Sequence, residues 1–350
     1  MTSRIYLDHA ATTPLLPAAR EAVLEGFAAW ANPSSPHARG RQARALLEDA
    51  RRRIAAALDW DGHLILTAGA SEAIALALGR ATASVVRAGA TEHDAVLRHV
   101  PPEARLPVDA DGMVRLPEAL PSGALLAIQQ VNSETGVIQP LDDLAARIHA
   151  AGAHLFADCS QGAGKLALPR GADMIAMSAH KLGGPIGIGA LLVRDLTLLR
   201  PSGGQEQGYR PGTEAMPLAL GFAAALEAER GWLARAADWR ARLDAGIRAA
   251  GGAVVAERAP RLPTIGSYRM PGVSAQAQLI RMDMAGIAVS AGSACSSGSL
   301  RPSHVLAAMG WGDAASAEIL RVSLGHDTQV RDIDAFLAQW QAVRTGTRTT

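Results

Sequence analysis

Two reactive side chains, Lys181 and Cys295, stand in sequence surroundings that an ordinary surface residue would not need. Lys181 follows the apolar run "DMIAMSAH" and precedes glycines in "SAHKLGGPIGIGAL". A lysine amine that is desolvated or held near other cations has a lowered pKa and can form a Schiff base with an aldehyde. Cys295 lies in "AVSAGSACSSGSL", where the small residues predict a flexible arm carrying a nucleophile. The alternative for Cys295 is a small residue that fills a small space.

Three further segments supply what a pyridoxal phosphate (PLP) site needs besides a lysine: an anion for the ring nitrogen, a stacking face and a phosphate cradle. Asp158 ends the apolar run "AHLFAD", and a carboxylate there faces the crevice at the carboxyl ends of the strands. His93 in "TEHDAV" is a stacking candidate, and "TAGASE" (67–72) offers backbone amides to a phosphate. The alternative for Asp158 or Ser160 is a helix N-cap, and a lone histidine is often only structural.

The elements that must position these residues form an alternating pattern. Short apolar runs at "HLILT", "ALLAIQQVN", "AHLFADC", "DMIAMSAH" and "IGALLV" alternate with helix-like stretches. This pattern predicts an α/β fold with a mostly parallel sheet covered on both faces. Residues 20–58 read as helical with a loop at 30–40, and 213–250 read as one long helix. From "RLPTIGSYRMPGV" onward we expect a second, smaller α+β part.

Composition narrows the class of function. Among 350 residues, 34 Lys and Arg face 33 Asp and Glu, so no net charge favours nucleic acid or anionic lipid. No stretch is long and uncharged enough for a membrane span, and no secretory signal is visible. Two cysteines form no disulfide framework and favour a cytoplasmic location. No P-loop, HExxH or paired CxxC occurs, and the glycines at 183–189 lack the GxGxxG spacing, so nucleotide hydrolysis, a metal site and NAD chemistry are not supported.

Together these motifs resemble the cysteine desulfurases, in the branch of nitrogenase- and iron–sulfur-cluster-maturation enzymes of the class V aminotransferase group. The matching motifs run nearly from end to end: "YLDHAATTP", "NPSSPH", "TAGASEA", "TEHDAV", "VNSETGVIQP", "DCSQGAGK", "SAHKLGGPIGIGAL", "GGQEQGYRPGT", "SAGSACSSG" and "RVSLG". The resemblance implies the fold type I PLP-dependent transferase architecture. This has a large PLP-binding domain (12–235) with a mostly parallel seven-stranded sheet flanked by helices, and a smaller α+β domain (1–11 with 236–350).

The resemblance also implies roles for individual residues. Lys181 forms the Schiff base with PLP, Asp158 pairs with the pyridine nitrogen, and the catalytic His93 stacks on the ring. Cys295 accepts the sulfur, whereas Cys159 matches a position of small residues and reads as core. The further cofactor contacts implied are Ala70, Ser71, Asn132, Ser133, Gln161, Ser178 and His180, with Thr213 from the neighbouring subunit of a homodimer. Arg321 would bind the substrate carboxylate, and Asn32 and His37 would line the substrate entrance.

The implied reaction converts L-cysteine to L-alanine and leaves a persulfide on Cys295, which a sulfur-acceptor protein then receives. The acceptor would serve an iron–sulfur cluster, a thiolated tRNA or a sulfur-containing cofactor. The alternatives are a selenocysteine lyase, another class V aminotransferase or lyase, and a catalytically silent partner that keeps only the fold. Transamination needs no thiol, so Cys295 favours the desulfurase. Ser133 replaces the second of two asparagines usual in the family.

Overall fold

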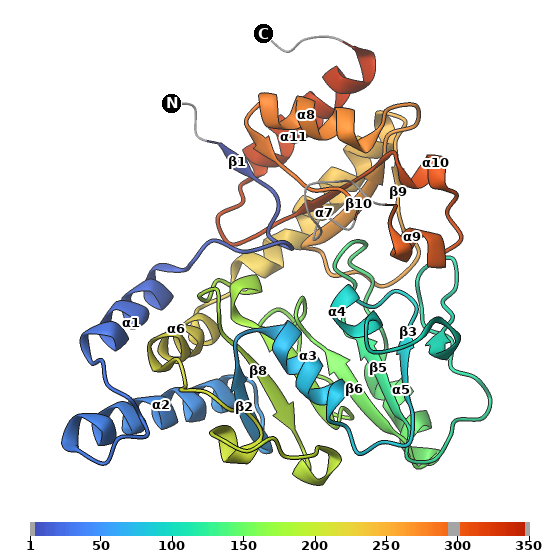
Figure 1. Ribbon diagram of the computed structural model, residues 1–350. Helices are drawn as coiled ribbons and strands as arrows, with labels where there is room; N and C mark the ends of the chain where they lie inside the picture. Colours follow the sequence, from blue (N-terminus) through green and yellow to red (C-terminus); the bar gives the residue numbers. More distant parts are fainter. Residues whose placement is uncertain (1–3, 293–301, 347–350) are drawn as a thin grey trace.

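A seven-stranded sheet forms the centre of the larger part of the molecule (Figure 1). The computed structural model describes residues 4–292 and 302–346. Strand β8 runs antiparallel to both of its neighbours, the outermost strand β2 and the inner strand β7. All other neighbouring strands are parallel. The predicted α/β fold with a mostly parallel seven-stranded sheet is therefore confirmed. In sheet order the strands are β2 (His63–Thr67), β8 (Gly189–Val193), β7 (Met174–Ser178), β6 (His154–Asp158), β5 (Leu125–Gln129), β3 (Val86–Gly89) and β4 (Arg105–Leu106).

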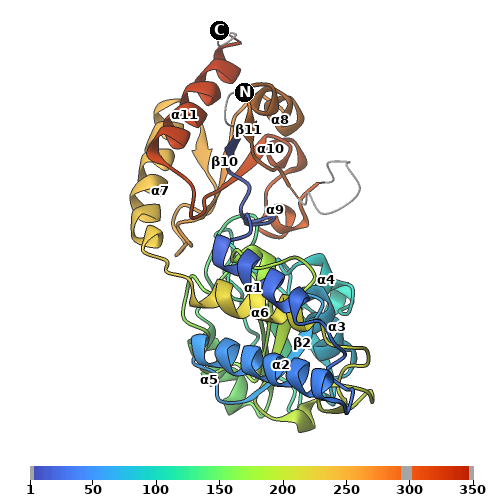
Figure 2. The ribbon, with the colours of Figure 1, turned by 90° about the vertical axis from the view of Figure 1, so that its left-hand side faces the viewer.

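Helices cover both faces of this sheet, which explains why its strands are continuously apolar. Leu64 and Leu66 of β2 pack in one buried cluster, and Ile65 between them packs in another on the opposite face. The first cluster joins the sheet to α1 (Pro17–Ala28), α2 (Ala38–Ala57), α5 (Leu141–Ala150) and α6 (Met216–Glu227). The second joins it to α3 (Ala70–Gly79) and α4 (Asp94–Leu97). Figure 2 shows α6 between α1 and α2.

The smaller part is built on a three-stranded antiparallel sheet, in the order β12 (Ile319–Ser323), β10 (Ile265–Arg269), β9 (Ala253–Val254). The N-terminal strand β1 (Ile5–Tyr6) pairs with β11 (Ile287–Ala288), and Leu7 lies in the same buried cluster as Leu320. The predicted domain limits, 12–235 and 1–11 with 236–350, stay a prediction. The helices here are α7 (Trp232–Ala249), α8 (Ala275–Met284), α9 (His304–Ala308), α10 (Asp313–Ser316) and α11 (Val330–Thr345).

The prediction of one long helix over 213–250 is wrong. The chain leaves the helical conformation between the end of α6 at Glu227 and the start of α7 at Trp232. Arg230 folds back across this break and donates hydrogen bonds to the carbonyls of Ala225, Leu226 and Ala228 at 2.7, 3.0 and 2.8 Å. Its guanidinium thus satisfies carbonyls that a helix end leaves without partners.

None of the helices within residues 4–292 and 302–346 combines the length and the apolar character that a bilayer span requires.

Candidate active site

The carboxyl ends of two neighbouring parallel strands bring Asp158 and Lys181 to one edge of the sheet. Asp158 is the last residue of β6, and Lys181 closes the 3-10 turn that follows β7. The charges of both groups act on the pKa of His93: the Asp158 carboxylate raises it and the Lys181 ammonium lowers it. Burial is the largest influence, and the net pKa of His93 is lowered. The structure thus brings together the three residues that the sequence singled out for the cofactor ring.

Lys181 and Gln161 converge on one backbone oxygen near the N-terminus. The Lys181 amine donates to the Ala10 carbonyl at 3.1 Å, and the Gln161 amide donates to the same oxygen at 2.9 Å. The second polar atom of the Gln161 side chain, Oε1, is buried without a hydrogen-bond partner among the residues that the structure describes. Such an atom is costly unless a ligand satisfies it, so Gln161 is placed to meet a polar group beside Lys181.

Asp158 is held by the turn that follows its strand. Asp158 is 7% exposed, and its side chain accepts hydrogen bonds from the backbone amide of Ser160 at 2.9 Å and from the Ser160 hydroxyl. The N-cap alternative for Asp158 or Ser160 is wrong, because residues 159–165 form turns and no helix begins there. The bonded oxygen is Oδ1, which leaves the other carboxylate oxygen for a ligand at the edge of the sheet.

His93 begins a short helix in a strongly buried neighbourhood. Its Nδ1 accepts the amide of Ala95 at 3.1 Å, so the ring caps α4. The preceding residue, Glu92, is completely buried; its carboxylate accepts the Gln129 amide at 2.8 Å, and burial raises its pKa well above the usual value. His304 contacts the Glu92 carbonyl through Nε2 at 2.8 Å. These contacts fix the backbone from which the His93 ring projects.

The candidate phosphate cradle is the turn between β2 and α3. Gly69 has φ +149° and ψ 178°, a conformation open in practice only to glycine. A Cβ added at Gly189 would lie 2.7 Å from the Gly69 Cα, so the two backbones need glycine to approach. The turn delivers Ala70 and Ser71 as the first residues of α3, whose N-terminus favours an anion. Ser178 ends β7 close to Gly69.

His180 lies between Lys181 and the N-terminal segment. Its Nδ1 lies 3.1 Å from the hydroxyl oxygen of Thr12. Burial, with the neighbouring Lys181 ammonium second, lowers the pKa of His180 to about 4. The ring is therefore neutral at neutral pH and acts there as a hydrogen-bonding group.

Arg321 is brought to the site from the other end of the chain. It lies in β12, is 7% exposed, and donates to the Asp8 carboxylate at 2.8 Å and to the Ser133 carbonyl at 3.1 Å. Its Nε is buried and has no hydrogen-bond partner within residues 4–292 and 302–346. A guanidinium held on two sides with a free donor suits a second carboxylate.

Asn132 serves the loop that carries Ser133. Its amide nitrogen donates to the Thr91 carbonyl at 3.1 Å, and its oxygen accepts the backbone amides of Glu134 and Thr135 at 3.0 and 2.8 Å. Ser133 contacts Arg321 through its backbone. The cofactor contacts predicted for Asn132 and Ser133 stay predictions.

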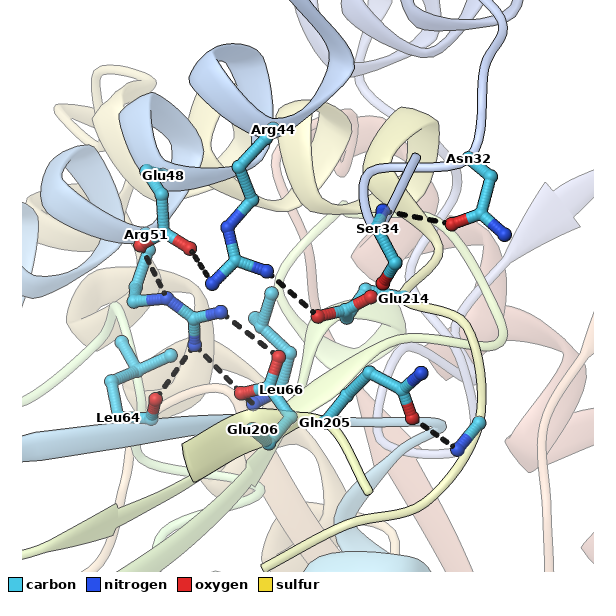
Figure 3. Close-up of polar contacts among 11 residues, drawn as sticks. Asn32, Ser34, Arg44, Glu48, Arg51, Leu64, Leu66, Gln205, Glu206 and Glu214 are labelled. Atoms are coloured by element: carbon cyan, nitrogen blue, oxygen red, sulfur yellow. Dashed lines mark hydrogen bonds and ion pairs between the residues drawn. The ribbon is translucent and has the colours of Figure 1, made fainter. Parts of the chain in front are cut away.

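Three predicted residues lie apart from this cluster on the surface. Asn32 is exposed, and its side-chain oxygen accepts the backbone amide of Ser34 at 2.8 Å (Figure 3). His37 is also exposed, and its ring caps α2 by accepting the backbone amide of Gly40 at 3.2 Å. Thr213 is exposed as well. Within one subunit, no described contact ties any of the three to Lys181.

Of the two cysteines, only Cys159 lies among the described residues. Cys295 lies outside the described residues, so its role and the predicted flexible arm stay predictions. Cys159 is completely buried, and burial raises its pKa well above the usual value. The reading of Cys159 as a core residue is confirmed, because a buried thiol that resists ionisation is a poor nucleophile.

Sequence reasoning assigned no role to the residues that hold the site from the N-terminal side. Asp8 pairs with Arg321, Ala10 accepts from Lys181 and Gln161, and Thr13 donates to the Lys181 carbonyl at 3.2 Å. The signal was present in "YLDHAATTP", a polar motif between apolar residues near the start of the chain.

Comparison with known proteins agrees with this arrangement. The sequence matches the aminotransferase class-V family over residues 5–336. A cysteine desulfurase of Gluconacetobacter diazotrophicus is 36% identical, over 95% of this chain and 91% of the relative. An IscS-like cysteine desulfurase of Mycobacterium tuberculosis is 37% identical, over 95% of this chain and 94% of the relative. A NifS-like protein from Rickettsia africae superimposes with a TM-score of 0.87 at 28% identity, over 98% of this chain and 99% of that one. The chain belongs to the class-V aminotransferase family, among the cysteine desulfurases.

Proposed function

We propose that this chain uses PLP to convert L-cysteine to L-alanine and that Cys295 receives the sulfur. The observation that carries the proposal is the meeting of Lys181, Asp158 and His93 at the carboxyl edge of the sheet, beside the unsatisfied oxygen of Gln161. An amine, an anion and a ring in one crevice are what a pyridoxal ring requires, and the relatives are named cysteine desulfurases.

The residues present fit the cofactor. Lys181 would bind its aldehyde carbon, Asp158 would face the ring nitrogen, and His93 would lie against the ring. Gln161 would meet the phenolic oxygen. The phosphate would be held by Ala70, Ser71, Ser178 and His180. When bound, PLP supplies an electron sink for the bond broken at the substrate α-carbon.

The chain's own residues orient the substrate and move its protons. Arg321 would bind the L-cysteine carboxylate in a two-point contact, while Asp8 keeps the guanidinium in place. The Lys181 amine would take the α-proton once the substrate has displaced it, since a neutral amine at that position is a competent base. Asp158 would keep the ring nitrogen protonated through its negative charge.

The sulfur step would take place at Cys295. Its thiolate would attack the substrate sulfur, so that an S–S bond forms and the C–S bond breaks. The electron pair of the broken bond stays with the substrate carbon, which takes up a proton and becomes the methyl group of alanine. The persulfide on Cys295 would then pass to a thiol of an acceptor protein. The buried Cys159 offers no alternative nucleophile.

A second copy of the chain would complete each site. Thr213 is exposed on its own subunit and would contact the phosphate in the neighbouring one. Asn32 and His37, exposed on the loop before α2, would line the substrate entrance.

The test is an assay of the purified protein with two isosteric substrates. L-cysteine should give L-alanine in PLP-dependent turnover, whereas L-serine, which has oxygen in place of sulfur, should give none. Visible absorbance of bound PLP should be present before substrate is added. A 2-oxo acid formed with transfer of the amino group to PLP would contradict the desulfurase and favour an aminotransferase.

A further inference from the structure

A fully buried carboxylate, Glu206, lies beside the candidate phosphate turn without belonging to it. Glu206 belongs to the segment 205–213 and points toward Arg51 (Figure 3). Its side chain is 0% exposed. Burying a carboxylate is costly unless charged and polar partners satisfy it. The contacts that satisfy this buried carboxylate therefore indicate what it does.

Glu206 and Arg51 together occupy the free edge of β2. Arg51 of α2 donates to the two Glu206 oxygens at 2.7 and 2.9 Å. The same carboxylate accepts the backbone amide of Leu66 at 2.8 Å, and Arg51 donates to the carbonyl of Leu64 at 2.7 Å. Because β2 is the outermost strand, these groups would otherwise lack partners. The ion pair takes the place that a neighbouring strand would fill.

The segment 205–213 also contacts the far side of the phosphate turn. Arg210 pairs with Glu72 in the first turn of α3, with Nε and Oε1 3.0 Å apart. The other oxygen of Glu72 accepts the backbone amide of Ala68, inside the turn. The chain on both sides of Gly69 is therefore fastened to one segment: Leu66, before Gly69, through Glu206, and Glu72, after it, through Arg210.

The backbone at this place is strained, and the side-chain contacts hold it. Glu206 and Gln207 have φ of +49° and +57°, the left-handed region that residues with a side chain rarely adopt. Two such residues in succession persist only where surrounding contacts over-determine them, and strain of this kind clusters at functional sites.

We propose that Glu206, paired with Arg51, is a positioning residue for the phosphate-binding turn 67–71. The inference rests on the proposed use of PLP and deepens it. Glu206 touches neither cofactor nor substrate. It acts by fixing the end of β2, so that Ala70 and Ser71 present their amides to the phosphate. The ring-binding residues Asp158 and Lys181 lie at the ends of other strands, β6 and β7, and do not depend on it.

Helix α2 offers a matched control. Arg53, two residues after Arg51, makes a two-point ion pair with Glu227, with distances of 2.8 and 2.6 Å. These side chains are 35% and 41% exposed and contact neither β2 nor the phosphate turn in any described hydrogen bond. Glu227→Gln, at the end of α6, removes an ion pair of the same kind from α2. It leaves the contacts of Glu206 with Arg51 and Leu66 in place.

The experiment compares PLP with pyridoxal, which lacks the phosphate, as ligands of the cofactor-free protein. Dissociation constants are measured by the change in visible absorbance for the wild type, Glu206→Gln and Glu227→Gln. Glu206→Gln should weaken PLP binding about tenfold and leave pyridoxal binding nearly unchanged, because only the phosphate contact depends on the turn. Glu227→Gln should change neither constant.

A second variant keeps the test decisive if Glu206→Gln does not fold, as judged by circular dichroism. Arg210→Gln removes the partly exposed contact to Glu72 and should lower the PLP-to-pyridoxal preference in the same direction by a smaller factor. An unchanged preference in a folded Glu206→Gln or Arg210→Gln protein would overturn the inference alone. A wild-type protein that binds neither ligand would overturn the proposed function as well.

Discussion

The candidate site has two halves that the chain assembles in different ways. The sheet half consists of Asp158, Ser178 and Lys181, which end two adjacent strands or follow them directly. The terminal half consists of Asp8, Ala10 and Arg321, and its central contact, from Arg321 to Asp8, joins residues 313 positions apart. Hydrogen bonds from Lys181 and Gln161 to the Ala10 carbonyl connect the two halves.

In the proposed enzyme the two halves have different tasks, cofactor binding and substrate binding. Residues of the sheet half would hold the cofactor, and they end or follow β6 and β7, in which every residue except His154 is buried. Residues of the terminal half would hold the substrate carboxylate, and they depend on the packing of the smaller part against the start of the chain. Damage to the sheet half should therefore remove cofactor chemistry, whereas damage to the terminal half should weaken substrate binding with the cofactor in place.

The largest effect is expected from Lys181→Ala, which breaks the sheet half. The variant should lose the visible absorbance of covalently bound PLP and all alanine formation, because the amine at the carboxyl edge that the proposal assigns to the cofactor aldehyde is removed. Absorbance spectra and an alanine assay check this, with circular dichroism as the folding control. Retained alanine formation in this variant would remove Lys181 from the reaction.

Arg321→Gln should break the terminal half alone. Loss of a charge-assisted carboxylate contact costs about 2–3 kcal/mol, so kcat/KM for L-cysteine should fall on the order of 100-fold, mainly through KM. The absorbance of bound PLP should stay as in the wild type. Asp8→Asn, which loosens Arg321 without removing it, should act in the same direction with a smaller change. A variant that loses PLP absorbance as well would show that the halves are not separable.

The contact between His180 and Thr12, residues that adjoin the sheet half and the N-terminal segment, should respond to pH. The pKa of His180 is lowered from 6.5 to about 4 in the folded protein, so as pH falls the unfolded chain takes up a proton first. The stability that this group contributes is complete above about pH 6.5 and is lost as pH falls towards 4. With allowance for the partial exposure of the ring, the effect is on the order of 1 kcal/mol.

His180→Asn should therefore flatten the fall of Tm between about pH 6.5 and pH 4 in the cofactor-free protein. Thermal denaturation at several pH values measures this slope. His93 and His326, whose pKa values are also lowered by burial, keep part of the slope in the variant. An unchanged slope would contradict the neutral, half-buried state of His180.

The sheet half was predictable from sequence because its signals are local. A buried strand that ends in Asp158, and another followed by Lys181 and glycines, can be read in short windows, and the sheet forces their ends together. The phosphate turn was equally visible, although α3 already begins at Ala70, inside the predicted segment 67–72.

The terminal half was not predictable in the same way, since its contacts join distant parts of the chain. The carbonyl of Ala10 carries no side-chain signal at all, and Asp8 acquires its role only when β12 folds beside it. Glu206 is a similar case, because its buried contacts come from α2 and β2. The helix predicted over 213–250 failed for a related reason: Arg230 reads as a helix former in sequence but caps the end of α6.

The central claim is that the chain moves sulfur from L-cysteine to Cys295, and the most direct test is mass spectrometry after a single turnover. The protein is mixed with a limiting amount of L-cysteine, alkylated and digested, with Cys159→Ala as the matched control. We predict that the peptide containing Cys295 gains the mass of one sulfur atom in the wild type and in Cys159→Ala. The amount of alanine formed should equal the amount of modified peptide. Alanine formed while Cys295 stays unmodified, or sulfur found on Cys159, would contradict it.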